Sequence, residues 1–426
     1  MKHNLLGYVI IGIILASCSA LPAPEINATP EPSSLPTATF LPTLESTPPA
    51  SGPTVLRVWV PPQFDPANGT SAGDLLQNRL NQYTEQRPDV RIQTRVKESS
   101  GTGGLLDSLN TANAAAPLAV PDLVLLPRAS LEIAALKGLL FPYDELSDNI
   151  NRGDWFPFAQ GLAQLQTSTF GLPFAGDALV SLYRPAEIDN PPTDWSSTLE
   201  LAQPIAFPAA EEQAYFTLAQ YLSTGAQIQD SDGRPILDSI SLIDLLTFYQ
   251  DGEAAGVMPF WLTQFTTDEQ SWESYTGNQV NMVITWTNRY LSSLPGDTAA
   301  APIFTEDGMP ITLANGWVWA LSNPQTERHA LSIDLAEYLT QGDFLAEWTE
   351  TAGYLPPRES ALEGWSNIAL RGLVEQIVRS AQVIPPNDIM AVVGPALHQA
   401  TVSVLKQQTD PVSAANQAIE SLETPQ

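Results

Sequence analysis

The sequence predicts an α/β protein with two lobes, and two observations carry that prediction. The first is length: 426 residues with 43% hydrophobic content exceed the roughly 250–300 residues at which a single core stops growing. The second is an alternation of strand and helix patterns before residue 145. Val55–Val60 is largely apolar, Val90–Val96 alternates apolar with polar residues, and Asp122–Leu126 is again apolar. Helical spacing follows each run, and the order β-α-β-α-β-α is typical of a parallel sheet covered on both faces.

The residues after Trp155 predict a second, mixed half. We expect two adjacent strands at Phe170–Phe174 and Ala178–Tyr183. A nearly continuous helical pattern begins at Thr326 and breaks only at Gly353–Pro357. Between them the pattern predicts strands at 204–207, 280–284 and 316–321 and helices at 213–224 and 239–250.

The charge balance excludes several classes of partner. Against 47 Asp and Glu stand 18 Lys and Arg, for a net charge of -29. Binding to nucleic acid or to an anionic membrane surface needs clustered cations, so neither is expected. One cysteine and three histidines argue against a disulfide framework or a metal site. His329 and His398 fall in helical patterns, which predicts solvated surface histidines.

The N-terminus predicts export. A charged start precedes an apolar or small stretch, Leu5–Ser17, which as a helix would span only about 20 Å against a bilayer core of about 30 Å. Cys18, the only cysteine, follows directly. The arrangement resembles a bacterial lipoprotein signal, whose cysteine is lipidated; the alternative is an ordinary signal peptide with a chance cysteine. We therefore expect a signal peptide at 1–17, and a lipidated Cys18 with a Pro/Thr-rich linker at 18–54.

Local motifs for catalysis are missing. No phosphate-binding loop, HExxH motif or GxSxG motif is present in the sequence. Asp230–Gly233 resembles the start of a calcium loop but lacks the later ligands, so a polar turn is expected. Paired carboxylates for glycoside hydrolysis stay open, because 47 acidic residues supply such pairs by chance.

Tryptophan gives the positive signal. The chain has ten, several of them at predicted strand ends or in loops. A tryptophan face stacks on the C–H face of a sugar ring, while Asp, Asn and Gln bind its hydroxyls. Trp59 is expected in the core, and one of Trp317 and Trp319 should also point inward. For Trp286, ligand stacking and core packing are both open.

Taken together, the segments resemble the family 1 extracellular solute-binding proteins of bacterial ABC importers. The resemblance begins at the lipoprotein-type signal and the Pro/Thr linker, and it covers Val55 to about Leu422. Its motifs are Val55–Val60, Pro121–Leu126 with Ala134–Leu140, Phe170–Tyr183, Thr193–Trp195, Ala314–Trp319 and Gly353–Pro356.

The resemblance implies a periplasmic-binding-protein-like fold (type II). Its two α/β lobes are joined by three crossovers and close on a ligand cleft. The implied lobes are 55–176 with 320–352, and 177–319 with 353–426. The residues implied to line the cleft are Gln63, Phe64, Arg128, Asp177, Trp286, Gly316, Trp317 and Tyr354, with Glu211 and Glu212 as further hydroxyl acceptors.

The resulting hypothesis is a lipid-anchored, extracytoplasmic receptor that is not an enzyme and needs no cofactor or metal. It would capture a small solute, a carbohydrate and in particular an oligosaccharide, and deliver it to an ABC permease in the membrane. We expect a monomer, held to the membrane by its N-terminal lipid alone. Two alternatives are a surface glycoside hydrolase and a polyamine-binding receptor, the latter motivated by the net charge of -29.

Overall fold

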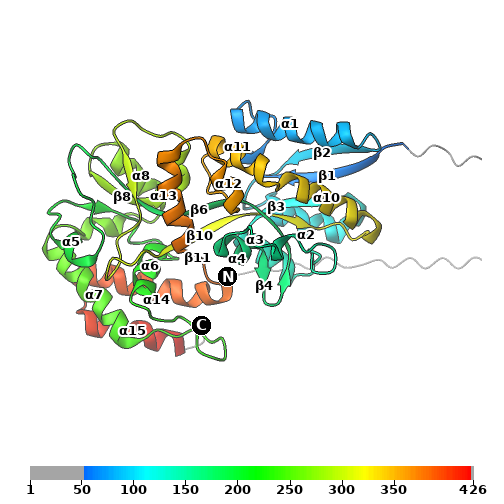
Figure 1. Ribbon diagram of the computed structural model, residues 1–426. Coiled ribbons are helices and arrows are strands. Elements are labelled where there is room, and N and C mark those ends of the chain that lie inside the picture. The colour runs from blue at the N-terminus through cyan, green and yellow to red at the C-terminus, as the bar shows by residue number, and fades with distance from the viewer. Residues whose placement is uncertain (1–51, 424–426) are drawn as a thin grey trace, which may run out of the picture. The chain divides into compact units, whose positions relative to one another are not determined.

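The computed structural model describes residues 52–423, and these residues are built around one nine-stranded mixed sheet (Figure 1). The strand order is β2-β1-β3-β10-β6-β8-β7, with β11 added beside β10 and β9 beside β6. The predicted signal peptide, Cys18 and the linker up to residue 51 lie outside the described residues. The strands are β1 Thr54–Val60, β2 Val90–Val96, β3 Leu123–Pro127, β6 Gly171–Tyr183, β7 Ile205–Ala206, β8 Met282–Trp286, β9 Ala299–Ala301, β10 Thr312–Leu321 and β11 Ala381–Val383; the pair β4 Gln164–Leu165 and β5 Ser168–Thr169 is separate.

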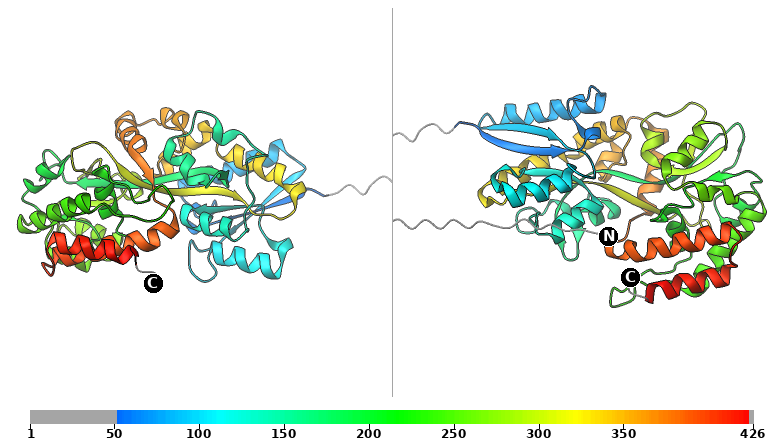
Figure 2. Two further views of the ribbon diagram at one scale, coloured as in Figure 1. Left: turned by 90° about the horizontal axis from the view of Figure 1, so that it is seen from below. Right: turned by 180° about the vertical axis from the view of Figure 1, so that it is seen from behind.

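Helices lie on both sides of these strands, as Figure 2 shows from two directions. They are α1 Ser71–Gln86, α2 Leu105–Ala115, α3 Arg128–Leu136, α4 Pro157–Ala163, α5 Trp195–Leu199, α6 Tyr215–Ser223, α7 Ser239–Ala254, α8 Asp268–Thr276, α9 Thr287–Leu291, α10 His329–Leu339, α11 Gly342–Ala352, α12 Glu359–Glu363, α13 Ile368–Ser380, α14 Asn387–Leu405 and α15 Pro411–Glu423. Polar caps fix some of their starts: Thr70 accepts from Gly73 N at α1, and Asp238 from Ser241 N at α7. The predicted α/β class is confirmed.

The first half of the chain forms the strands that its patterning predicts. Strands β2, β1 and β3 are parallel neighbours, and α1 buries Leu76, Leu80 and Tyr83 at helical spacing. We call the part around β1–β3 the first lobe and the part around β7–β9 the second lobe. Strand β10 then enters the sheet antiparallel to β3, so the sheet is mixed although its first three strands are parallel.

Two long strands run through both lobes. The prediction of two separate strands at 170–174 and 178–183 is wrong, because β6 continues from Gly171 to Tyr183. Its first part pairs with β10, and its second part pairs with β8 and β9. A third segment lies beside β6, where Gly176 and Leu355 exchange backbone hydrogen bonds of 2.9 and 2.8 Å. These three segments are the crossovers.

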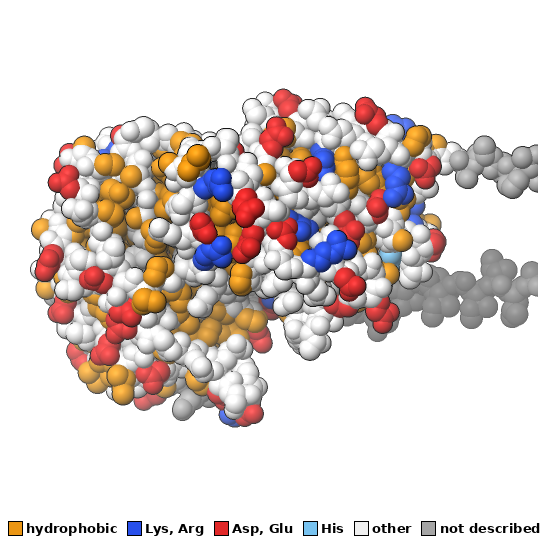
Figure 3. All heavy atoms as spheres, viewed as in Figure 1, with side chains coloured by type: hydrophobic (Ala, Val, Ile, Leu, Met, Phe, Trp, Pro, Cys, Tyr) orange, Lys and Arg blue, Asp and Glu red, His pale blue; other side chains and the backbone are white. Residues whose placement is uncertain are grey.

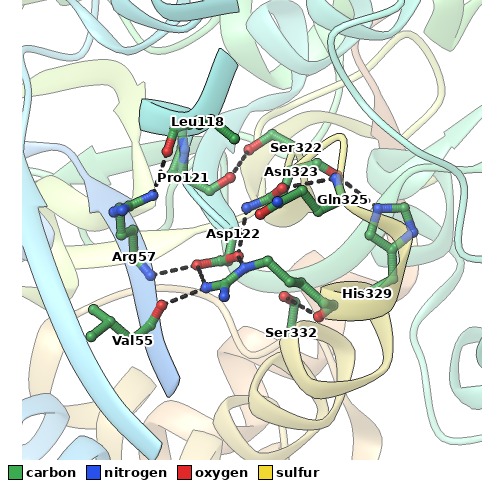
Figure 4. Close-up of polar contacts among 11 residues, drawn as sticks. Val55, Arg57, Leu118, Pro121, Asp122, Ser322, Asn323, Gln325, His329 and Ser332 are labelled. Atoms are coloured by element: carbon green, nitrogen blue, oxygen red, sulfur yellow. Dashed lines mark hydrogen bonds and ion pairs between the residues drawn. The ribbon is translucent and has the colours of Figure 1, made fainter. Parts of the chain in front are cut away.

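A buried carboxylate holds the first lobe together (Figure 4). Asp122 begins the third strand motif and has 0% exposed surface. Its Oδ2 accepts from the backbone N of Arg57 at 2.7 Å and from Arg328 Nη2 at 2.8 Å. Its Oδ1 accepts from Arg328 Nε at 2.6 Å and from Asn323 Nδ2 at 2.8 Å. Arg328 Nη2 also donates to the carbonyl of Val55, so one ion pair joins β1, β3 and the end of β10.

The histidines differ from the sequence-based expectation. His329 is buried, with Nε2 at 2.7 Å from the carbonyl of Asn323 and its ring against Phe141. His398 is half-buried, with Nδ1 at 3.1 Å from the carbonyl of Glu211. Both positions were expected on a solvated surface. Backbone carbonyls supply the partners that let them be buried instead, and helical spacing alone does not reveal such partners.

One described helix, α14, is long and apolar enough to cross a membrane by length and composition. Of its most apolar stretch, 61% is buried inside the protein. It packs against α15, α7 and α6. This is the burial expected of a core helix of the second lobe.

Candidate functional site

Two cavities meet at Asn315, where β10 crosses between the lobes. The larger, of about 280 Å³, is lined by Asp177, Trp286, Asn315, Gly316 and Trp317. The smaller, of about 40 Å³, is lined by Arg128, Ala129, Glu132, Gln213, Tyr215, Asn315, Ile384, Pro385, Asn387 and Met390. The structure thus brings four of the residues expected at the cleft into one cavity, and places Arg128 in the cavity beside it.

Strand register explains why these side chains meet. Asn315 lies opposite Asp177, and Trp317 lies opposite Ala175, so all four residues face the same side of the β10–β6 pair. Trp286 ends β8 opposite Leu179 and therefore flanks the same face. Because side chains alternate along a strand, one continuous surface carries an acid, an amide and two indoles.

The opposite face of the same strands is closed by α4, and glycine allows this close approach. A Cβ added to Gly176 would lie 2.7 Å from the Phe158 ring, and one added to Gly316 would lie 2.5 Å from the carbonyl of Ala175 and collide with Leu162. Gly316 therefore shapes the cavity through its backbone, by letting β10 and β6 lie tightly on α4.

Asp177 has one oxygen that is fully used and one that is free. Its Oδ1 accepts from Thr287 Oγ1 at 2.6 Å, from Asn288 N at 3.0 Å and from Ala178 N at 3.1 Å. All of these hydrogen bonds use Oδ1, Oδ2 has no hydrogen-bond partner among the described residues, and Asp177 lines the larger cavity. Burial raises the pKa of Asp177 to about 6, although the three hydrogen bonds oppose that shift. The carboxylate is rigidly held and keeps one free acceptor.

Asn315 offers the complementary donor. Its Oδ1 accepts from Gly316 N at 2.8 Å, while its Nδ2 has no partner among the described residues. The neighbouring free atoms are therefore an acceptor on Asp177 and a donor on Asn315. A hydroxyl group donates one hydrogen bond and accepts others, so it fits such a pair.

A buried aromatic cluster supports Trp317 from behind. Phe64, which ends the 3-10 turn Pro62–Phe64, is only 2% exposed. Its ring centroid lies 5.1 Å from Trp317, 5.3 Å from Tyr354 and 5.6 Å from Trp348. Phe64 therefore belongs to the packing beneath the cavity and does not line it.

Tyr354 and Gln63 also lie outside the two cavity walls. Tyr354 stacks on Trp348 with the planes 3° apart, and its pKa is raised first by burial and then by the charge of Asp177. Gln63 is exposed, and its Oε1 accepts from Ser99 Oγ at 3.2 Å. The structure places Tyr354 near the acid of the site, and Gln63 on the surface.

Arg128 is buried beside the smaller cavity with few partners. Its Nη1 lies 3.4 Å from Glu132 Oε2, and its Nε is buried with no hydrogen-bond partner. Burial lowers its pKa, against the opposing effect of Glu132. Glu132 in turn accepts from the backbone N of Asn387 at 3.0 Å, which joins α3 to the start of α14. The guanidinium is therefore held in place with donors to spare.

The second lobe contributes Tyr215 and Glu211. The ring of Tyr215 lies edge-on to Trp286, with centroids 6.0 Å apart. Glu211 Oε2 accepts from Tyr215 N at 3.3 Å, and burial raises the pKa of Glu211 to about 7. Glu212 is exposed and lines neither cavity. Of the two carboxylates expected to accept hydrogen bonds from ligand hydroxyls, Glu211 lies beside Tyr215, which lines the smaller cavity.

Sequence reasoning missed Asn315, Tyr215, Gln213, Thr287 and Asn288. Asn315 stands inside the Ala314–Trp319 motif, and Thr287 and Asn288 directly follow Trp286, so their position was a usable signal. Nothing in the local pattern distinguishes Gln213 or Tyr215, which enter the site only because α6 begins beside β8.

The larger hollows of the described residues lie elsewhere. One of about 510 Å³ lies between α1 and β2, and one of about 500 Å³ lies between α14 and α15. Neither is lined by an aromatic ring.

No group of three metal-ligating side chains occurs among residues 52–423. On the face drawn in Figure 3, acidic side chains are spread widely and basic ones are few.

Comparisons with known proteins agree with this architecture. The family described as bacterial extracellular solute-binding protein matches residues 78–370. A cyclic alpha-maltosyl-1,6-maltose binding protein from Arthrobacter globiformis is 17% identical, with a TM-score of 0.71 and coverage of 87% of this chain and 98% of that one. The sugar-binding protein MalE from Xanthomonas citri is 18% identical, with a TM-score of 0.71 and coverage of 87% and 98%.

A maltose-bound MalE3 of T. maritima is 17% identical, with a TM-score of 0.67 and coverage of 87% of this chain and 99% of that chain. No curated protein matches the sequence. The family match confirms the resemblance drawn from the sequence motifs, and the structural likeness confirms the two-lobed fold.

Proposed function

Because the chain belongs to the bacterial extracellular solute-binding proteins, which bind solutes and are not enzymes, we propose that it captures a carbohydrate in the cleft at Asn315. This membership removes the glycoside hydrolase alternative. The printed descriptions of the similar structures name maltose, cyclic maltosyl-maltose and maltotetraose as ligands of those proteins, which supports a sugar here.

One observation carries the proposal. Asp177 and Asn315 are cross-strand neighbours that each keep one free polar atom, and in the strand register they lie between the positions of Trp286 and Trp317. The acid and amide suit a hydroxyl, and the indoles suit the C–H face of a sugar ring. In this site Asp177 and Asn315 orient the ring and the indoles supply most of the buried contact area.

The remaining parts of the hypothesis follow the family. Capture would be followed by delivery to an ABC permease, and Cys18 would carry the lipid that holds a monomer to the outside of the membrane. We propose that the lobes divide as 55–176 with 320–352, and 177–319 with 353–426. Within the range 353–426, α12 packs on α11 and Arg358 Nη1 binds Asp154 at 2.9 Å, so this part of the proposed second lobe contacts the first lobe.

The test is a binding panel with matched variants. Maltose, maltotriose, mannotriose and tagatose are measured by calorimetry and thermal shift on the wild-type chain, Asp177→Ala, Trp286→Ala and Trp272→Ala. Trp272 is a control of equal size in the second lobe, where it stacks on Tyr275 and lines neither cavity. We expect the first two variants to lose more than about 1 kcal/mol of binding free energy, and the control to bind as wild type. Wild-type affinity in both site variants would contradict the assignment.

A second candidate, a polyamine, is favoured by one feature. Asp177 Oδ2 and Glu211 Oε1 are both acceptors without a partner among the described residues, and both lie beside aromatic rings. A cationic amine suits carboxylates and aromatic faces. Spermidine in the same panel separates the two candidates, because binding of spermidine without any sugar would select the polyamine.

A further inference from the structure

Helix α9 touches two of the three crossovers at once. At its start, Thr287 Oγ1 and the backbone N of Asn288 both donate to Asp177 Oδ1 on β6, at 2.6 and 3.0 Å. Its far end lies against Gly353, since a Cβ built on Gly353 would collide with the backbone N of Ser292. Gly353 has φ +73°, so its conformation and its close contact both require glycine.

The side chain of Asn288 closes the connection between the two crossovers. Its Nδ2 donates to the carbonyl of Gly353 at 2.9 Å and approaches the carbonyl of Ala352 at 3.4 Å. The same residue therefore binds the first crossover through its backbone and the third crossover through its amide. Trp286, which lines the cavity, directly precedes this pair of contacts in the chain.

From this geometry we infer that Asn288 is a positioning residue which couples the ligand-contacting groups of the cleft to the hinge. A ligand held by Trp286 and Asp177 acts on the residue that also fixes the carbonyl of Gly353. Its amide then sets the angle between the lobes and how narrowly that angle is distributed. The coupling to ligand rests on the proposed function; the control of the hinge does not.

The alternative is that Asn288 only stabilises the second lobe. Asn281 offers a matched control for that case, because it is an asparagine of the same lobe whose Nδ2 donates to Gln203 Oε1 at 2.9 Å, away from the crossovers. Asn288→Ala removes the amide but keeps the backbone N–H to Asp177. Asn288→Asp keeps the size of the side chain but replaces the donor with a carboxylate, whose oxygens are repelled by the carbonyls of Gly353 and Ala352.

The first measurement uses no ligand. Cys18, the only cysteine, is replaced by serine in the full chain, and spin labels are attached through Lys137→Cys in the first lobe and Lys406→Cys in the second, both exposed positions. The distribution of label distances is then compared between this background, Asn288→Ala, Asn288→Asp and Asn281→Ala. We expect both Asn288 variants to broaden or shift the distribution, and Asn281→Ala to leave it unchanged.

The second measurement adds maltotriose. Affinity is reduced in proportion to the population that can close, so a loosened hinge should weaken binding by about fivefold without any lost ligand contact. Thermal unfolding of each ligand-free variant measures whether stability alone has changed. Asn288 variants whose distance distribution matches the background, or changes no more than that of Asn281→Ala, overturn the inference. A changed distribution with no response to maltotriose in any variant upholds the hinge role and counts against this sugar as ligand.

Discussion

At the scale of single residues, we propose that Asp177 combines a structural and a binding role in one carboxylate. Three donors hold Oδ1, and this fixes the direction of Oδ2 before any ligand arrives. A ligand group meeting Oδ2 therefore loses no affinity to side-chain ordering, which is the advantage of a preorganised site. Burial acts against ionisation of this carboxyl group, because it raises the pKa of Asp177 to about 6.

Sugar binding should therefore depend on pH through Asp177. Above about pH 6 the ligand-free carboxylate is ionised and accepts a charge-assisted hydrogen bond. Below that value a proton must first leave, so affinity should fall as the pH decreases, by about three- to tenfold between about pH 7 and about pH 5. Calorimetry with maltotriose at several pH values measures this. Asp177→Asn should flatten the part of the profile centred near pH 6, and Glu211→Gln should leave that part in place. A flat wild-type profile would count against an ionised Asp177 in the complex.

Asp122 differs from Asp177 because both of its carboxylate oxygens accept hydrogen bonds from groups of the protein itself. Asp122→Asn should lower the free energy of unfolding by about 3–5 kcal/mol, because it leaves Arg328 without a buried partner. Urea unfolding measures this. The control Asp343→Asn removes an exposed carboxylate 3.7 Å from Arg79 and should change stability by less than about 1 kcal/mol. Sugar affinity of the folded Asp122 variant should stay at the wild-type value, and a selective loss of affinity would show that Asp122 acts on the cleft.

At the scale of elements, the sequence pattern predicts the strands within the first lobe but not the continuity of a strand that crosses between the lobes. The sequence predicts Val55–Val60 from its largely apolar run and Val90–Val96 from its period of two, and both patterns are local information. The continuity of β6 was not recognised, because Ala175–Asp177 has the composition of a turn. Its pairing with β10, its backbone hydrogen bonds with Leu355 and its contact with α4 keep that stretch extended.

The candidate site likewise contains residues that the sequence pattern could predict and residues that it could not. Trp286 and Trp317 could be proposed because indoles at strand ends are visible in the sequence. The pairing of Asn315 with Asp177 depends on the register of two strands more than a hundred residues apart, and Tyr215 depends on where α6 begins. The family resemblance implies Phe64 at the cleft, but the rings of Trp317, Trp348 and Tyr354 pack around it.

A prediction at the scale of elements concerns Gly353 in the third crossover. Gly353→Ala should destabilise the protein by more than about 1 kcal/mol, since the new Cβ strains a positive φ and pushes against α9. Gly372→Ala is the matched control, because Gly372 lies exposed in α13 with no atom near its Cβ position. A gain of roughly 0.5–1 kcal/mol is expected there from helix propensity. Equal effects of the two substitutions on thermal unfolding would show that the contact between Gly353 and Ser292 is not tight.

At the scale of the whole molecule, the acidic surface and the aromatic cleft make different demands on a ligand. A net charge of -29 attracts any cation from a distance, whereas a neutral sugar does not sense it. The fold class could be predicted from the alternating strand and helix patterns before residue 145. The charge of the ligand could not, because Asp177 and Glu211 lie among aromatic rings that suit sugars and amines equally.

Salt separates these two ligand classes. Raising the salt concentration from about 20 mM to about 500 mM shortens the screening length from about 20 Å to about 4 Å. The affinity for a neutral sugar should stay within about twofold, because its contacts with Asp177, Asn315 and the indoles are short-ranged. A polyamine should instead lose most of its affinity, since attraction by the acidic surface is then screened. Calorimetry with maltotriose and with spermidine at both salt concentrations measures this directly. A maltotriose affinity that falls as steeply with salt as that of spermidine would contradict binding of the sugar through short-ranged contacts alone.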